Sequence, residues 1–152
     1  MFVRFVLNSW SLFKLDFQKI QSDPKLQDGY HGLGFSQGAQ FLRAVAQTCP
    51  NPPMKNLVSV DGQHQGVYGF PGCPPGTLEF CDDLRDLLEI AYLPGIQDRL
   101  VQAQYWHDPI QVDLHRRSSQ FIGPINNEVR DGVAHIEEYK TNLNKLETLG
   151  KA

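Results

Sequence analysis

A single serine stands between two glycines in the stretch GFSQG, which runs from Gly34 to Gly38. A strand that turns sharply into a helix can raise one side chain above a sheet, and the residues two positions on either side must then be small. Ser36 would be the nucleophile of such a turn, and the backbone N–H of Gln37 would face a developing oxyanion. The alternative is a tight turn in which Ser36 caps the following helix. The spacing favours acyl transfer if a strand precedes Ser36 and a helix follows it.

The neighbouring residues predict that context. Residues 29–35 form a short apolar segment flanked by glycine, as expected of a buried strand. Residues 37–49 carry apolar side chains at helical spacing, and the prolines of 50–53 end that helix. The run at 56–60 is rich in β-branched residues and predicts a second strand. Strand, helix and strand in succession predict an α/β fold with parallel strands and a right-handed crossover.

The remaining sequence predicts further helices and two irregular segments. Apolar spacing indicates helices over 10–22, 78–93, 94–106 and 136–149. Residues 61–77, rich in proline and glycine, are expected to form a loop, and residues 107–133 to be irregular. Because ligands of open α/β sheets bind beyond the carboxyl ends of the strands, the 61–77 loop is expected at the functional edge.

Composition limits the function classes. The 152 residues carry a net charge of −3 and are 41% hydrophobic, which suits one globular domain over residues 1–152. The basic residues are scattered apart from a short cluster at 115–117, so nucleic-acid binding is not indicated. No apolar run is long enough for a transmembrane segment. The apolar N-terminus is interrupted by Arg4, Asn8 and Ser9, and it makes no convincing signal peptide.

The cysteines and histidines predict no metal site. Neither a C-x-x-C nor an H-x-x-x-H pair occurs, and no cofactor motif is present. Cys73 and Cys81 lie eight positions apart, which leaves both a disulfide and two buried thiols open. Cys49 stands apart from them.

From about residue 23 to residue 146, the chain resembles the palmitoyl-protein thioesterases, which remove fatty acyl chains from cysteines. The resemblance is carried by three stretches in order, GFSQGAQFLRAVAQTCPNPP, SVDGQHQGVYGFPGCP and RLVQAQYWHDPI. Residues 1–20 match poorly. The resemblance implies a partial α/β-hydrolase fold, a parallel sheet with flanking helices and a nucleophile elbow. It also implies Ser36 as nucleophile and Gln37 as backbone oxyanion donor, with site-lining residues at Gly34, Gly38, His64 and Gln65.

The same resemblance implies the substrates and surroundings. S-palmitoylated proteins or other acyl thioesters would be the substrates, with no cofactor and no metal. A lysosomal or secretory location is implied, together with a disulfide between Cys73 and Cys81. The partner of Cys49 would lie outside the present sequence.

The catalytic triad is expected to be incomplete. In this family the acid and the histidine follow everything matched here, so Ser36 is the one triad member that we expect in the chain. Asp108 should turn the chain before Pro109, and His115 and His135 should be solvated. None of the histidines after Ser36 is expected to act as its base. They are His64, His107, His115 and His135.

We therefore expect the 152-residue chain by itself to be an inactive part of a thioesterase. Two alternatives stay open at this point. One is a general lipase or esterase on the same fold. The other is a non-catalytic truncated protein that binds acyl chains or partner proteins.

Overall fold

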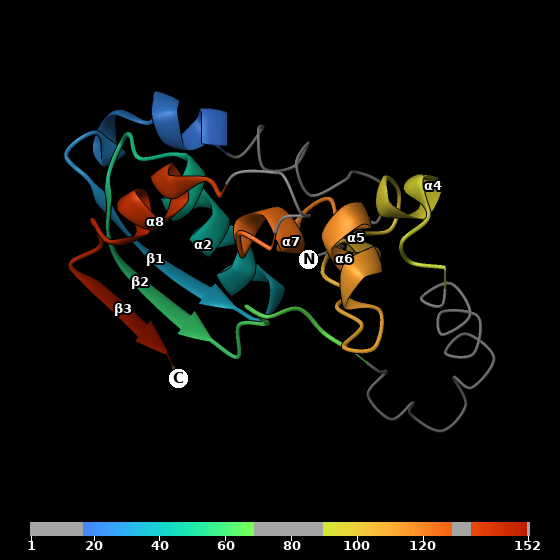
Figure 1. Ribbon diagram of the computed structural model, residues 1–152. Helices are drawn as coiled ribbons and strands as arrows, with labels where there is room; N and C mark the ends of the chain where they lie inside the picture. Colours follow the sequence, from blue (N-terminus) through green and yellow to red (C-terminus); the bar gives the residue numbers. More distant parts are fainter. Residues whose placement is uncertain (1–16, 69–89, 129–134, 152) are drawn as a thin grey trace, which may run out of the picture. The chain divides into compact units, whose positions relative to one another are not determined.

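The computed structural model describes residues 17–68, 90–128 and 135–151 (Figure 1). The chain divides into two compact units. In the described residues, the sheet unit comprises 17–64 and 135–151, and the helical unit comprises 65–68 and 90–128.

The sheet unit is built on three parallel strands in the order β1-β2-β3. They are β1 (Tyr30–Phe35), β2 (Met54–Val60) and β3 (Thr148–Lys151). Helix α2 (Gln37–Thr48) connects β1 to β2. The predicted strand–helix–strand unit and the α/β class are therefore confirmed. The register places Gly34 opposite Ser59 and Phe35 opposite Val60, so β1 and β2 end together.

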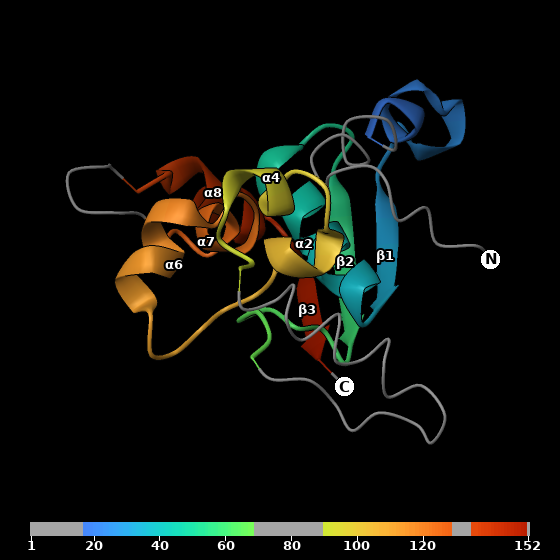
Figure 2. The same ribbon diagram turned by 90° about the vertical axis from the view of Figure 1, so that its right-hand side faces the viewer.

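Helices α2 and α8 (Glu137–Leu143) lie on the same face of the sheet in both views (Figure 1 and Figure 2). Alternation along β1 directs Gly32 and Gly34 into the buried layer, whereas Leu33 and Phe35 are exposed on the other face. The buried Asn142 of α8 donates its side-chain N–H to the backbone oxygen of Gln47, at 2.9 Å. The apolar core of the sheet unit includes Ala39, Ala44, Val45, Ala46, Met54 and Leu57.

The segment before β1 is helical over residues 17–22 and continues as the 3-10 helix η1 (Pro24–Leu26). The side chain of Asp23 accepts a hydrogen bond from the N–H of Lys25 and caps η1. The predicted helix over 10–22 is thus confirmed at its end, and residues 10–16 lie outside the described residues.

The helical unit contains α4 (Pro94–Gln97), α5 (Val101–Gln104), α6 (Val112–Ser118) and α7 (Ile122–Ile125). Ala91 and Ala103 are buried together, with Ile96, Leu100 and Trp106 packed against them. In neither unit do the described helices include one that is long and apolar enough to cross a membrane.

Three predicted segments differ from the structure. The helix predicted over 94–106 is two short helices, because the chain turns at residues 98–100. The segment 107–133 is not irregular throughout, since α6 and α7 lie within it. The final helix ends at Leu143 rather than near residue 149, and residues 148–151 pair with β2 as a strand. Residues 90–93 form a turn, and the rest of the helix predicted over 78–93 lies outside the described residues.

Buried glutamine side chains hold the short helices of the helical unit. Gln97 is fully buried and donates to the backbone oxygens of Ala91 (2.7 Å) and Ala103 (2.6 Å). Its side-chain oxygen accepts from the N–H of Gln120 at 3.1 Å, and its backbone oxygen accepts from Gln104 at 2.7 Å. One side chain therefore makes hydrogen bonds to three backbone groups that belong to different segments of the unit.

Asp108 organises the turn before α6, as its position ahead of Pro109 predicts. Its carboxylate accepts from the N–H groups of Ile110 (2.8 Å) and Gln111 (3.3 Å) and from the Gln111 side chain (2.9 Å). Burial alone would raise the pKa of this carboxyl, but the hydrogen bonds from Ile110 and Gln111 outweigh it and lower the pKa.

Replacing Gln97 with leucine should strongly destabilise the helical unit. The change removes all three hydrogen bonds and leaves the buried carbonyl of Ala91 without its side-chain donor, which costs about 2–4 kcal/mol. Urea unfolding followed by circular dichroism measures the loss. Gln102→Leu is the matched control, because the Gln102 side-chain oxygen has no hydrogen-bond partner among the described residues. Equal losses in the two variants would contradict the role assigned to Gln97.

Asp108→Asn should lower stability at pH 7 by about 1–2 kcal/mol, since it removes charge-assisted hydrogen bonds. A carboxyl whose folded pKa is depressed contributes stability above its unfolded pKa of about 3.9, and this is lost as the pH falls through the folded pKa. The difference in free energy of unfolding between wild type and variant should therefore become smaller below about pH 4. Urea unfolding at several pH values checks this, with the exposed Asp113→Asn as control. A difference that stays constant with pH would contradict the assignment.

Candidate active site

Ser36 occupies the turn between β1 and α2 in a strained backbone conformation. Its φ is 51° and its ψ is −119°, a region that residues with a side chain rarely adopt. Its N–H donates to the backbone oxygen of Val60 at 2.8 Å, which ties the turn to the end of β2. The Ser36 side chain makes no capping hydrogen bond to α2, so the capping alternative is wrong. Ser36 is partly exposed and therefore accessible to a substrate.

The close approach of α2 to β1 requires glycine at position 34. A Cβ on Gly34 would lie 2.5 Å from the Cα and 2.6 Å from the nitrogen of Ala39, far inside van der Waals contact. This confirms the steric reason predicted for Gly34. At Gly38 an added Cβ meets no atom within 4 Å, so within the described part of the chain the steric reason predicted there is wrong.

The N-terminus of α2 directs backbone N–H groups toward the turn. Gln37 is its first residue, and its N–H is among the four that an α-helix leaves without an internal acceptor. Its side chain is exposed, so the chemistry available at this position is that of the backbone. An anion forming next to Ser36 would meet the positive end of a helix of 12 residues.

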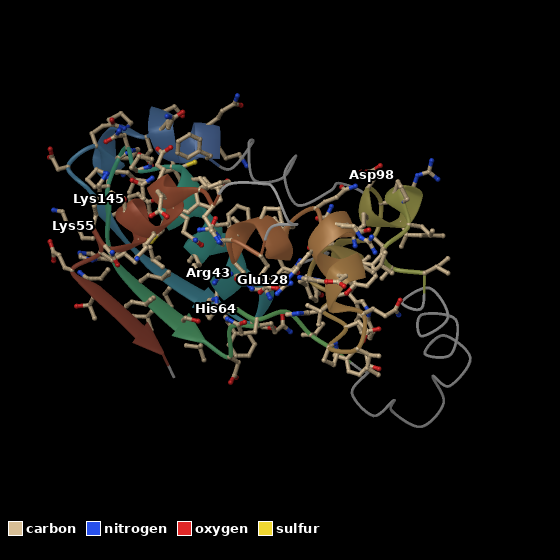
Figure 3. All side chains as sticks on the ribbon, in the orientation of Figure 1. Arg43, Lys55, His64, Asp98, Glu128 and Lys145 are labelled. Atoms are coloured by element: carbon tan, nitrogen blue, oxygen red, sulfur yellow. The ribbon has the colours of Figure 1, made fainter. Side chains whose placement is uncertain are left out.

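The loop after β2 is fastened to the same helix. Gln40 donates its side-chain N–H to the backbone oxygen of Gln63, and Arg43 donates to that of His64 at 3.2 Å (Figure 3). The hydroxyl of Ser59, which is buried in β2, lies 2.7 Å from Nε2 of His64 and shares a hydrogen bond with it. His64 is therefore held at the carboxyl end of β2, with Nε2 engaged by Ser59 rather than by Ser36.

These supporting contacts escape sequence reasoning. Gln40 and Arg43 lie three positions apart on α2 and so share a face of the helix, but nothing in the sequence names their acceptors more than twenty residues away. Ser59 sits in a run that predicts a strand, and only the alternation along that strand hints that its hydroxyl is buried.

The remaining residues singled out in the sequence do not gather around Ser36 in the described part of the sheet unit. Gln65 belongs to the helical unit, where its backbone oxygen lies 2.6 Å from Nδ1 of His107. His115 was expected to be solvated, but it is fully buried because α6 forms and turns it inward. His135 is exposed, as predicted. The proposed pair Cys73 and Cys81 lies outside the described residues.

Cys49 follows α2 as a buried free thiol. Burial raises its pKa, although the Thr48 hydroxyl 3.5 Å away acts in the opposite direction. Burial, with the neighbouring Cys49 as a second cause, also raises the pKa of Tyr30 to about 12. Both groups are therefore neutral near pH 7, and the thiol is not an activated nucleophile.

The fold and the turn define a partial α/β protein with a strained serine between strand and helix. The sequence profile of the palmitoyl protein thioesterase family matches residues 5–150. Palmitoyl-protein thioesterase 1 of Caenorhabditis elegans is 53% identical over 146 residues, which cover 95% of this chain and 47% of the relative.

More distant relatives agree. Palmitoyl-protein thioesterase 3 of Dictyostelium discoideum is 36% identical over 132 residues, covering 87% of this chain and 43% of the relative. A lysosomal thioesterase PPT2 homolog of Drosophila melanogaster is 30% identical over 133 residues, which cover 81% of this chain and 42% of the relative. The chain therefore belongs to the palmitoyl protein thioesterase family, and it spans less than half the length of these relatives.

Replacing Gly34 and Gly38 with alanine should have different effects on the stability of the sheet unit. Gly34→Ala forces Cβ against the backbone of α2 and should destabilise the sheet unit by about 1–3 kcal/mol or more. Gly38→Ala enters open space within a helix and should be neutral or stabilise by up to about 1 kcal/mol. Urea unfolding of the two variants measures the difference. A tolerated Gly34→Ala would contradict the close approach of α2 to β1.

Proposed function

We propose that this chain is the nucleophile-bearing part of a thioesterase that removes fatty acyl groups from S-acylated cysteines. The observation that carries the proposal is the strained Ser36 at the end of β1, ahead of a long helix, in a chain of this family. The substrates would be S-palmitoylated proteins or smaller acyl thioesters. The relatives named as lysosomal thioesterases support a lysosomal or secretory location.

In the proposed reaction, the Ser36 hydroxyl oxygen attacks the thioester carbonyl while its proton passes to a base. The backbone N–H of Gln37 donates a hydrogen bond to the resulting oxyanion. Collapse of the tetrahedral intermediate breaks the carbon–sulfur bond, and the cysteine thiolate takes up the proton as it leaves. Water then attacks the acyl-serine ester and releases the fatty acid, which restores the Ser36 hydroxyl.

The general base is proposed to come from sequence that the relatives have beyond the matched region. Among the described residues, the Ser36 hydroxyl has no hydrogen-bond partner, and Nε2 of His64 is bonded to Ser59. In this proposal, the described residues contribute Ser36 as the nucleophile and the N-terminus of α2 as the oxyanion site, and the base comes from elsewhere. We propose that the 152-residue chain alone has no turnover.

A chimaera tests both parts of the proposal. The 146 matched residues of the Caenorhabditis elegans relative are replaced by those of this chain, and hydrolysis of a palmitoyl-thioester peptide is measured. We expect the chimaera to be active and the chain alone to be inactive. Ser36→Ala in the chimaera should lower kcat by about four to six orders of magnitude, because the nucleophile is lost.

Ser22→Ala is the matched control, since this exposed hydroxyl bonds only to a local backbone oxygen. Turnover by the chain alone that depends on Ser36 would show that an internal base exists. Activity that survives Ser36→Ala would overturn the nucleophile. Faster hydrolysis of matched oxygen esters than of thioesters would favour a general esterase.

A further inference from the structure

Three side chains that the proposed reaction does not use meet in the helical unit. His107 precedes α6, His115 lies on α6, and Glu128 follows α7. Oε2 of Glu128 lies 3.6 Å from Nε2 of His107 and 3.3 Å from Nε2 of His115. The two imidazole rings are stacked, with centroids 4.0 Å apart and planes 15° from parallel. Two nitrogens and one oxygen therefore face one another within 4.8 Å.

The remaining polar atom of each group is held by another partner. Nδ1 of His107 lies 2.6 Å from the backbone oxygen of Gln65, an acceptor, so Nδ1 carries the hydrogen and Nε2 keeps its lone pair. Oε1 of Glu128 accepts from the side-chain amide of Asn126 at 2.9 Å (Glu128 is labelled in Figure 3). This is the arrangement in which an outer hydrogen bond orients a metal ligand.

His115 supplies the third group. Its side chain is fully buried, and Nδ1 lies 3.3 Å from the hydroxyl of Tyr92. Its Nε2 is buried, and the nearest acceptor among the described residues is Oε2 of Glu128, 3.3 Å away. A buried imidazole nitrogen without a partner is costly unless something binds it.

We propose that His107, His115 and Glu128 bind a divalent transition-metal ion, with Zn²⁺ as the best match. Bonds of 2.0–2.1 Å at a tetrahedral angle separate ligand atoms by about 3.4 Å, close to the two nitrogen–oxygen distances observed. The two rings are stacked and nearly parallel, so both must turn before their Nε2 lone pairs converge on one ion. The sequence gives no sign of this site, because its ligands are eight and thirteen residues apart.

The ligand set determines which ion fits and what the ion does. Two imidazoles and one carboxylate suit Zn²⁺, whereas Mg²⁺ and Ca²⁺ prefer oxygen ligands. The ion would join the chain before α6 to α6 itself and to the residue that follows α7. It would thus stabilise the helical unit, and one coordination position would remain for water.

Metal titration of the metal-free 152-residue chain tests the proposal. Zn²⁺ affinity is measured by competition with a chromophoric chelator, and coordination by the visible spectrum of the Co²⁺ form. We expect one ion per chain, a Co²⁺ spectrum without a thiolate charge-transfer band, and a melting temperature raised by several degrees with Zn²⁺. Millimolar Mg²⁺ should not compete.

Glu128→Gln keeps the shape of the side chain and should weaken Zn²⁺ binding at least about 100-fold, as should His107→Gln. Glu137→Gln and His135→Gln make the same changes at exposed positions and should have no effect. Circular dichroism verifies that each variant is folded. Binding that is unchanged in Glu128→Gln and His107→Gln, or undetectable in the wild type, would overturn the site. A thiolate band lost in Cys73→Ser would do the same, because it would place the ion on cysteine.

Discussion

The contact between the backbone of β1 at Gly34 and that of α2 at Ala39 is the constraint on which the sheet unit depends. It brings the helix so close to the strand that the turn residue is forced to a positive φ. The cost of that conformation is about 1–3 kcal/mol, and the hydrogen bond from Ser36 to Val60 and the parallel pairing of β1 with β2 offset it. The strain is thus a consequence of packing, and it places the hydroxyl where a substrate can reach it.

The sequence predicts the parts of this fold that local rules determine. Residues 30–60 combine an apolar strand, an amphipathic helix stopped by prolines and a β-branched strand, and each segment would adopt its structure in many contexts. The segment 148–151 has no such signal, because it becomes a strand only by pairing with β2. Helices α4 to α7 are short, and side chains such as Gln97 and Asp108 fix their ends. From the sequence alone, such polar residues would be predicted to lie on the surface.

Some features of the candidate site can likewise be predicted from local sequence, and others depend on the fold. Ser36 and Gly34 can be found because a strand–turn–helix elbow is a local steric problem with few solutions. The hydrogen bonds from α2 to the loop after β2 join residues about twenty positions apart. They can be predicted only once the fold is known. The burial of His115 was missed for a further reason, since it depends on a helix, α6, that the sequence did not predict.

One face of the sheet is covered by helices, and the other exposes apolar side chains close to Ser36. Parallel sheets occur almost only with both faces covered, and here α2 and α8 cover one. The other face leaves Leu33 75% and Phe35 68% exposed, as seen in the described residues. A segment that covered this face and reached the carboxyl end of β1 would pass beside Ser36, whose hydroxyl has no hydrogen-bond partner among the described residues. Completing the sheet and completing the proposed catalytic site would then be one structural event, which gives a physical reason for the proposal that Ser36 alone does not suffice.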